Sequence, residues 1–343
     1  MKHWQFIFVT ALFVMLLEGC ASPSNQSPTM TQVNTPLVPS ATPSLTYTAT
    51  VPFTATPTFT ATPEPTSTPS PTPAPVTLVG AADVSYCGED WLGDEESAKV
   101  LAAVIEQHPE AQIFVAGDNV QGVGMMAEYL NCFTPTWGQF KDRIHPAPGN
   151  HDYMTDQGAP YYTYFGEQAG EAGQGYYSYD LGEWHIIALN SNCNDIGCRE
   201  GSRQMAWLRQ DLENNNKRCT MMYWHHPRYS SGLAGSYGSV YDFWAIGLEY
   251  GVEMVVSGHD HGYERFAPQD NDGNASPVGI RQFVVGTGGA YLRDWGEVKP
   301  NSEIRDNETH GVIKFTLYPD SYAWEFLPSD DGPLTDSGSG VCH

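Results

Sequence analysis

Short apolar segments rich in β-branched residues recur along the chain from residue 76 onward, and most have the length of a single strand. Most of them end in Gly, Asp or His, as strands that run into tight turns do. The third of these segments is longer than the others, and Leu181-Gly182-Glu183 within it predicts the turn of a hairpin. The segments are 76–84, 111–118, 176–191, 219–226, 252–260, 280–289 and 311–319.

Three segments between these strands have helical spacing. The segments 202–215 and 240–250 are two of them. The third is 96–108, which has Ala98, Leu101, Val104 and Ile105 on one face. The acidic residues Asp94 to Glu96 stand at its N-terminus, where they interact favourably with the positive end of the helix dipole. Strand–helix alternation followed by hairpins predicts an α/β domain with two packed β-sheets flanked by helices.

The first 75 residues do not resemble domain material. Residues 1–19 have one Lys near the start and an apolar run from Phe6 to Leu17, which predicts a signal peptide. The run ends at Leu17-Glu18-Gly19-Cys20, which resembles a bacterial lipobox with a lipidated Cys20, although Glu18 is unusual there. The alternative is an ordinary signal peptide with an incidental Cys, and the protein would then be secreted.

Residues 20–75 are rich in Pro, Thr and Ser. The segment from residue 21 holds 13 of the 25 prolines of the chain and one charged residue, Glu64. Such a composition cannot bury a core, and proline keeps the chain extended. The composition of residues 20–75 predicts a disordered stalk between a membrane and a folded domain, residues 76–343. A lipid anchor would be the only attachment of the protein to that membrane.

Charge and cysteine content narrow the class of protein. The net charge of −24 argues against a protein that coats nucleic acid, but bound metal ions would let the domain accept a small phosphorylated substrate. Setting Cys20 aside leaves an even number of cysteines, which suggests three disulfides in an exported chain. The favoured pairs are Cys193–Cys198 and Cys87–Cys132, which leaves Cys219 for Cys342.

Polar residues directly follow four of the buried-looking strands. They are Asp83, Asp118, His225 and His259. Each one alone is more often a turn residue or a cap. Because ligand groups in α/β folds collect just past the carboxyl ends of strands, four residues at the same place in their strands predict a site.

Further candidate ligands lie in the same short motifs. PGNHDY contains Asn150, His151 and Asp152, YWHHP contains His226, and SGHDHG contains His261. Oxygen and imidazole ligands without thiolates suit Fe, Mn or Zn. One carboxylate can bridge two ions, and a pair of ions about 3.5–4 Å apart is a standard clamp for displacement at phosphorus.

These motifs, in this order over residues 83–265, resemble the calcineurin-like metallophosphoesterase superfamily, with GNHD and GHDH as the most specific signatures. The forms HxPxYSSG and GHxHxYER are similar to the purple acid phosphatase branch. The resemblance implies an αββα sandwich fold. It also implies a dinuclear phosphoesterase, most simply a monoesterase, in which a metal-bound hydroxide is the nucleophile.

The resemblance also implies roles for individual residues. Asp118 matches the carboxylate that bridges both metals, and His151 matches the catalytic histidine. Asp152 could orient His151 or simply cap the loop, and His226 is either substrate-facing or a packing residue. The first metal is expected to bind Asp83 and His261, and the second metal is expected to bind Asn150, His225 and His259.

The chain departs from the family pattern at the first metal. Many members begin with DxH, but Val84 and Ser85 follow Asp83 here. Purple acid phosphatases have a metal-binding tyrosine three residues after the bridging Asp, and this chain has Gln121 at that position. Water, Gln121 or Tyr86 would have to complete the site, so a weaker or divalent first metal is expected. The alternative functions are a phosphodiesterase and a surface binding protein whose catalytic site has decayed.

Overall fold

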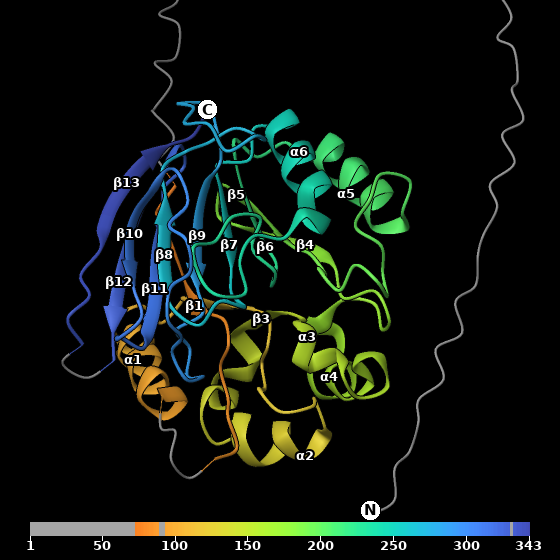
Figure 1. The fold of residues 1–343 in the computed structure, drawn as a ribbon, viewed down its shortest axis with the longest axis vertical. Coiled ribbons are helices and arrows are strands. Elements are labelled where there is room, and N and C mark those ends of the chain that lie inside the picture. The colour runs from red at the N-terminus through yellow and green to blue at the C-terminus, as the bar shows by residue number, and fades with distance from the viewer. Residues whose placement is uncertain (1–72, 89–92, 330–331) are drawn as a thin grey trace, which may run out of the picture. The chain divides into compact units, whose positions relative to one another are not determined.

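The computed structural model describes residues 73–88, 93–329 and 332–343. Two mixed β-sheets with helices around them form this part of the chain (Figure 1), which confirms the predicted fold class. The predicted signal peptide, Cys20 and the stalk lie outside the described residues. Within those residues, no helix combines the length and the apolar character needed to cross a bilayer.

The first sheet has six strands, and three of them run parallel from the start of the described chain. In sheet order the strands are β13 (Ser337–Val341), β12 (Ser321–Pro328), β11 (Gly311–Leu317), β1 (Val76–Ala81), β2 (Gln112–Ala116) and β3 (Ile144–Ala147). The sequence pattern did not predict β3, which contains Pro146 and lies at the sheet edge, where a missing N–H donor is tolerated. It also missed β12 and β13.

The second sheet has seven strands. Its strands in sheet order are β10 (Ser302–Asp306), β8 (Tyr263–Phe266), β9 (Arg281–Val285), β7 (Met254–Ser257), β6 (Cys219–Tyr223), β5 (Trp184–Ala188) and β4 (Tyr177–Leu181). Strands β5, β6, β7 and β9 are parallel. Leu181 pairs with Trp184, so the predicted hairpin is confirmed and Gly182 takes a positive φ of 60° in its turn.

Aromatic side chains join the two sheets. Phe114 on β2 lies 5.6 Å from Tyr223 on β6, measured between ring centroids, and Phe283 on β9 lies 5.4 Å from Phe315 on β11. All four side chains are buried. Because these contacts hold the sheets face to face, the loops at the carboxyl ends of their parallel strands are held close together as well.

Three longer helices match the predicted helical segments. They are α1 (Gly93–Gln107), α5 (Arg203–Asn214) and α6 (Tyr241–Glu249). Helices α5 and α6 lie together beside the second sheet (Figure 1) and bury Leu208 and Phe243 in one apolar cluster with Met222 of β6. Shorter helices connect β2 to β4, namely α2 (Met126–Glu128), α3 (Asn150–Tyr153) and α4 (Ala159–Phe165).

Three disulfides link the cysteines in the predicted pairs. The bridges are Cys87–Cys132, Cys193–Cys198 and Cys219–Cys342, with Cα–Cα separations of 5.4, 5.0 and 5.6 Å. The first and third bridges tie together residues 45 and 123 positions apart. Because disulfides persist in oxidising compartments, these bridges indicate a protein that works outside a reducing cytoplasm.

Asp94 is a buried carboxylate in the first turn of α1. Its side chain is 4% exposed, and Thr136 Oγ1 donates to it at 3.2 Å. Burial raises the pKa of Asp94 from 3.8 to about 6, although hydrogen bonds from Ser85 and Thr136 act in the opposite direction. The carboxyl group therefore binds a proton more tightly in the folded protein than in the unfolded chain.

We expect Asp94→Asn to change how stability depends on pH. Because the folded-state pKa is the higher one, the free energy of unfolding should fall by up to about 3 kcal/mol as pH rises from about 4 to 6. The variant should lack this contribution and exceed the wild type in stability near neutral pH. Urea denaturation at several pH values measures the free energy of unfolding of both proteins. Glu95→Gln, at an exposed neighbouring position, is the control. A variant less stable than the wild type at neutral pH would contradict the prediction.

Candidate metal centre

Four polar residues occupy equivalent positions after parallel strands. Asp83, Asp118, His225 and His259 each come two residues after the end of a strand, β1, β2, β6 and β7 respectively. Backbone hydrogen bonds join these loops in pairs, from Val84 N to Asp118 O at 2.9 Å and from Gly258 N to His225 O at 3.0 Å. The two sheets therefore bring all four loops to one end of the domain.

One group of ligand atoms converges on His225. Its Nε2 lies 3.1 Å from Asp118 Oδ2, 3.1 Å from His259 Nδ1 and 3.1 Å from Asn150 Oδ1. Ligand atoms of Asp118, His225 and His259 all lie within 4.8 Å of one another. Asp118 and His225 are almost completely buried. Carboxylate, amide and imidazole ligands gathered in this way suit a divalent or trivalent transition metal.

The histidines of the centre have their other ring nitrogen bound to protein groups. His225 Nδ1 contacts the Ala116 carbonyl at 3.1 Å, and His261 Nδ1 contacts the Tyr291 carbonyl at 2.7 Å. A carbonyl oxygen only accepts, so each Nδ1 carries a proton, and it is Nε2 that can offer a lone pair to a metal ion. Metal-binding histidines in proteins are commonly oriented by such a hydrogen bond.

A second group of ligand atoms lies around Asp83. His261 Nε2 is 3.3 Å from Asp83 Oδ1, and the backbone N–H of His259 donates to Asp83 Oδ2 at 2.7 Å. Gln121 Nε2 donates to Asp83 Oδ1 at 3.1 Å. Gln121, which stands where purple acid phosphatases have a tyrosine, therefore contacts a candidate ligand of the first metal. Tyr86 is 39% exposed. The predicted ligands of both metals thus lie in one connected cluster.

The charges of the cluster are strongly coupled. Burial alone would lower the pKa of His225, but the carboxylates of Asp118 and Asp83 raise it to about 9. Burial would likewise raise the pKa of Asp83, but His261, His225 and His259 hold it below its usual value. Without another cation, a proton on His225 therefore compensates the two buried carboxylates, which is the electrostatic role that a bound metal ion would take over.

The backbone of the centre is held in an uncommon conformation. Asp83, Asp118 and His259 have φ values of 59°, 50° and 71°, in the left-handed region that side chains other than Gly seldom adopt. Among the described residues only three other non-glycine positions have a positive φ. Backbone strain of this kind costs about 1–3 kcal/mol per residue and concentrates at functional sites.

Glycines let the loops approach one another closely. A Cβ atom on Gly149 would lie 2.1 Å from Asp118 Oδ1, and one on Gly258 would lie 2.5 Å from Asp83 Oδ2. Each of them directly precedes a candidate ligand, in the motifs GNHD and SGHDH. Any side chain there would displace a carboxylate, so these two glycines are required by the geometry of the centre.

His151 lies at the mouth of the centre. Its backbone N–H donates to Asp118 Oδ1 at 2.8 Å, and its ring Nδ1 donates to the Gly122 carbonyl at 2.5 Å. Its Nε2 is 3.9 Å from Asp118 Oδ2, and the side chain is 23% exposed. The ring therefore stands beside the candidate ligands with Nε2 directed towards the centre and with access to solvent.

Asp152 has the role of a loop cap. It is completely buried and accepts hydrogen bonds from Gly149 N, Asn119 N, Asn119 Nδ2 and Tyr129 OH at 2.8, 3.2, 3.0 and 2.6 Å. Burial and the nearby charge of Asp118 raise its pKa to about 6. These contacts fix the start of α3, so the geometry favours capping over the alternative that Asp152 orients the His151 ring.

His226 lies between the candidate ligands and an adjoining pocket. Its Nδ1 is 2.9 Å from Ser191 Oγ, and its ring is 4.6 Å from that of His259. Burial and the charge of His225 lower its pKa to about 2, so the ring is neutral. His226 and Asn150 line a pocket of about 420 Å³, hereafter the inner pocket, which favours the substrate-facing alternative.

Two residues of the centre were not predicted from the sequence. Tyr237 OH lies 2.6 Å from His259 Nε2 and thereby directs His259 Nδ1 towards His225. Asp260 accepts hydrogen bonds from Ala234 N and Gly235 N at 2.8 and 3.2 Å, which ties the 230–236 loop to the ligand loop. Asp260 stands inside the GHDH motif, which is a local signal, but nothing in the sequence links Tyr237 to His259.

We expect Tyr237→Phe to weaken metal binding through His259. The variant removes one hydroxyl group and keeps the ring, so His259 loses the partner that fixes its orientation. Loss of such a partner typically costs about 10–100-fold in metal affinity or activity. Isothermal titration of the metal-free protein with Zn²⁺ measures the affinity, and Tyr241→Phe, on the exposed start of α6, is the control. An unchanged affinity would show that Tyr237 does not position His259.

Comparison with known proteins identifies relatives of the chain. The sequence model of the calcineurin-like phosphoesterase family matches residues 84–263. A protein named purple acid phosphatase 18 from Arabidopsis thaliana is 23% identical over 290 residues, which cover 77% of this chain and 62% of the relative. Another Arabidopsis thaliana relative, named probable inactive purple acid phosphatase 27, is 25% identical over 61% of this chain and 41% of its own length.

A solved structure has the same fold. The purple acid phosphatase from yellow lupin (Lupinus luteus) seeds superimposes with a TM-score of 0.66 at 20% sequence identity, over 78% of this chain and 54% of the lupin chain. The chain therefore spans only part of the length of these relatives, from 41% to 62% in the two Arabidopsis thaliana proteins.

Proposed function

Because the chain belongs to the calcineurin-like phosphoesterase family, we propose that it hydrolyses phosphate esters, most simply monoesters, at a centre of two metal ions. The observation that carries the proposal is the common direction of the candidate ligands. His225 and His261 each donate from Nδ1 to a backbone carbonyl and turn Nε2 towards a buried carboxylate. A site of this kind is built to bind cations.

The residues fit the metals that the family uses. In this proposal Asp118 would be shared by two ions, Asp83 and His261 would hold the first, and three residues would hold the second, namely Asn150, His225 and His259. Nitrogen and oxygen ligands without a thiolate are compatible with Fe, Zn or Mn. Bound metal ions would supply Lewis acidity and a water with a pKa near neutrality.

Residues outside the ligand set would bind the substrate and move the proton. His151, with Nε2 facing the centre, is placed to donate a hydrogen bond to the phosphate or a proton to the leaving oxygen. His226 and Asn150 would contact the ester from the side of the inner pocket. Gln121, hydrogen-bonded to Asp83, would hold that carboxylate in position at the first metal in place of a tyrosine ligand.

The same proposal covers where the protein acts. The three disulfides support a position outside the cytoplasm. We propose that Cys20 is lipidated and that the segment up to residue 75 is the stalk that connects the phosphoesterase domain to a membrane. If Cys20 is not lipidated, the protein is secreted. Mass spectrometry of the mature N-terminus distinguishes these two forms.

Turnover of two chromogenic substrates tests the activity. The protein, stripped with a chelator and reloaded with Fe, Zn or Mn, should hydrolyse p-nitrophenyl phosphate faster than bis(p-nitrophenyl) phosphate. Faster hydrolysis of the diester would identify a phosphodiesterase. No turnover of either substrate with any metal would favour a surface binding protein, an alternative supported by Gln121 and by the relatives named inactive.

A further inference from the structure

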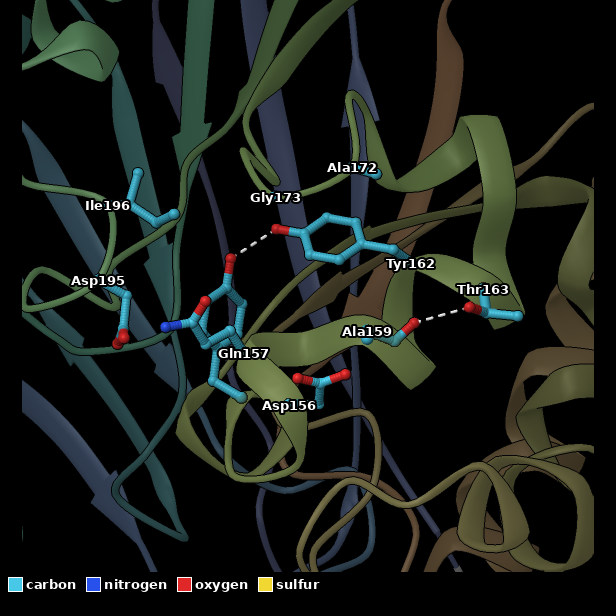
Figure 2. Close-up of a pocket in the computed structure, with 10 residues that line it drawn as sticks. Asp156, Gln157, Ala159, Tyr162, Thr163, Ala172, Gly173, Asp195 and Ile196 are labelled. Carbon is cyan, nitrogen blue, oxygen red and sulfur yellow. Dashed lines mark hydrogen bonds between the residues drawn. The ribbon is translucent and has the colours of Figure 1, made fainter.

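A second pocket continues the inner pocket away from the metal centre. This outer pocket has a volume of about 400 Å³ and shares two lining residues, Tyr153 and Asp195, with the inner pocket of about 420 Å³. At the opposite end the inner pocket reaches Asn150 and His226. The two pockets together therefore lead from the candidate ligands to Asp156 and Tyr162. Figure 2 shows the outer pocket with these two residues.

The lining of both pockets includes carboxylates, amides and hydroxyls. Neither Lys nor Arg is among the residues that line them. The inner pocket presents amides and hydroxyls, such as those of Asn192 and Ser239, and Asp195 stands where the two pockets meet. Asp156 adds a second carboxylate in the outer pocket. A leaving group with a further phosphate or carboxylate would meet uncompensated negative charge there.

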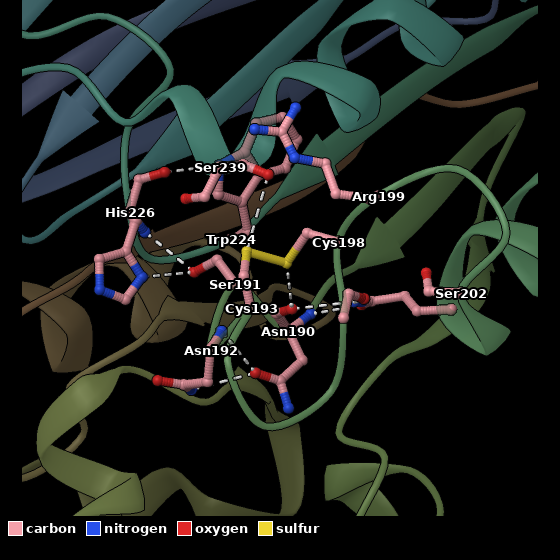
Figure 3. The surroundings of a disulfide bond; sticks show 12 residues. Asn190, Ser191, Asn192, Cys193, Cys198, Arg199, Ser202, Trp224, His226 and Ser239 are labelled. Carbon is pink, nitrogen blue, oxygen red and sulfur yellow. Dashed lines mark hydrogen bonds between the residues drawn. A yellow bond between two sulfur atoms is a disulfide. The ribbon is translucent and has the colours of Figure 1, made fainter. Parts of the chain in front are cut away.

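The loop that carries Asp195 is fixed in place. The Cys193–Cys198 disulfide closes it (Figure 3). Asn190, close to the start of the loop, donates from Nδ2 to Tyr153 OH at 2.6 Å. Gln204 Nε2 donates to the Asn190 carbonyl at 2.9 Å. Because the loop is already ordered, little conformational entropy is lost when a ligand binds to it.

Aromatic rings also belong to the lining of the outer pocket. Tyr153 and Tyr162 line the outer pocket, and their hydroxyl groups are 2.5 Å apart. Because these hydroxyls bind each other, the rings are held as fixed surfaces. Carboxylates combined with aromatic rings suit an organic cation, which a carboxylate attracts and a tyrosine ring can contact.

We propose that the site acts on phosphate esters of amino alcohols, with the phosphate at the metal centre and the ammonium group near Asp195. This inference rests on the proposed phosphoesterase function. The reaction adds water across the ester, so the P–O bond to the alcohol breaks, and the products are inorganic phosphate and the amino alcohol. The two pockets bind the part of the substrate that leaves as that alcohol.

A series of esters that differ only in terminal charge tests the proposal. The probes are aminobutyl, hydroxybutyl and carboxypropyl phosphate, with kcat/KM measured on the metal-loaded enzyme. The wild type should prefer the ammonium ester over the carboxylate ester by about threefold to tenfold, because the carboxylates are exposed and partly screened. Asp195→Asn should reduce this ratio, and Asp195→Lys should invert it. The preference should also decrease at high salt.

The outcomes separate the inference from the function on which it rests. The matched control Glu106→Lys, on the exposed face of α1, changes the net charge equally and should leave the ratio of the ammonium to the carboxylate ester unchanged. Equal kcat/KM values for the three esters, or an Asp195→Lys enzyme with an unchanged ratio, would overturn the inference alone. No hydrolysis of any ester with any metal would overturn the proposed function together with it.

Discussion

Replacing Asp118 with Asn should leave a folded protein that has lost phosphatase activity. Asp118 supplies both of its oxygens to the centre: Oδ2 lies 3.1 Å from His225 Nε2, and Oδ1 accepts the His151 N–H at 2.8 Å. Asparagine has nearly the same shape but no charge and only one acceptor oxygen. It cannot bridge two cations, so we expect kcat/KM to fall by about a thousandfold or more.

The same variant should lose metal. Elemental analysis of the purified protein should give fewer bound ions per chain than in the wild type, and added metal should not restore activity. Asp336→Asn is a matched control, because Asp336 is also buried but bonds to Tyr263 and Arg265 away from the centre. The control should lose stability and keep its metal. An Asp118→Asn enzyme within tenfold of wild-type activity would exclude the bridging role.

Replacing His151 with Ala should remove activity without removing metal. The contact between His151 and Asp118 Oδ1 comes from the backbone N–H, so the substitution preserves it. Only the ring, with Nε2 at the mouth of the centre, is lost. A positioned general acid or base contributes about 10²–10⁴-fold, and we expect a loss of kcat in that range.

The choice of substrate shows whether the ring donates a proton. An alkyl phosphate needs its leaving oxygen protonated, whereas p-nitrophenolate leaves without help. The loss in His151→Ala should therefore be larger for hydroxybutyl phosphate than for p-nitrophenyl phosphate. His108→Ala, at a partly exposed position after α1, is the control and should keep full activity. Equal losses for both substrates would indicate that His151 binds the phosphate and does not protonate the leaving group.

Local features of the sequence predicted a large part of the fold. The apolar segments gave the strands that are buried on both faces, because such strands are short apolar runs that end in turn residues. Strands β3 and β13 were missed for a physical reason. The first contains Pro146, and the second, SGSGV, alternates Ser and Gly without an apolar pattern. Both are edge strands, whose formation depends on a neighbouring strand.

The sequence by itself determined which residues are candidates for the centre. Asp83, Asp118, His225 and His259 follow their strands directly, and parallel strands of one sheet end at the same edge, so proximity within each sheet could be expected. The cysteine spacing likewise indicated one of the disulfides, because a five-residue separation between Cys193 and Cys198 closes a short loop. These are local relations between a residue and its own element.

Only the tertiary structure decided how the side chains are held and what surrounds them. Packing of the two sheets brings Asp118 of one sheet within 3.1 Å of His225 of the other, and Tyr237 reaches His259 across 22 residues of chain. The pocket around Asp195 likewise joins segments that are distant in sequence. Long-range contacts depend on the packing of whole elements, which no short motif encodes, so the sequence could indicate the candidate ligands but not their hydrogen-bond partners.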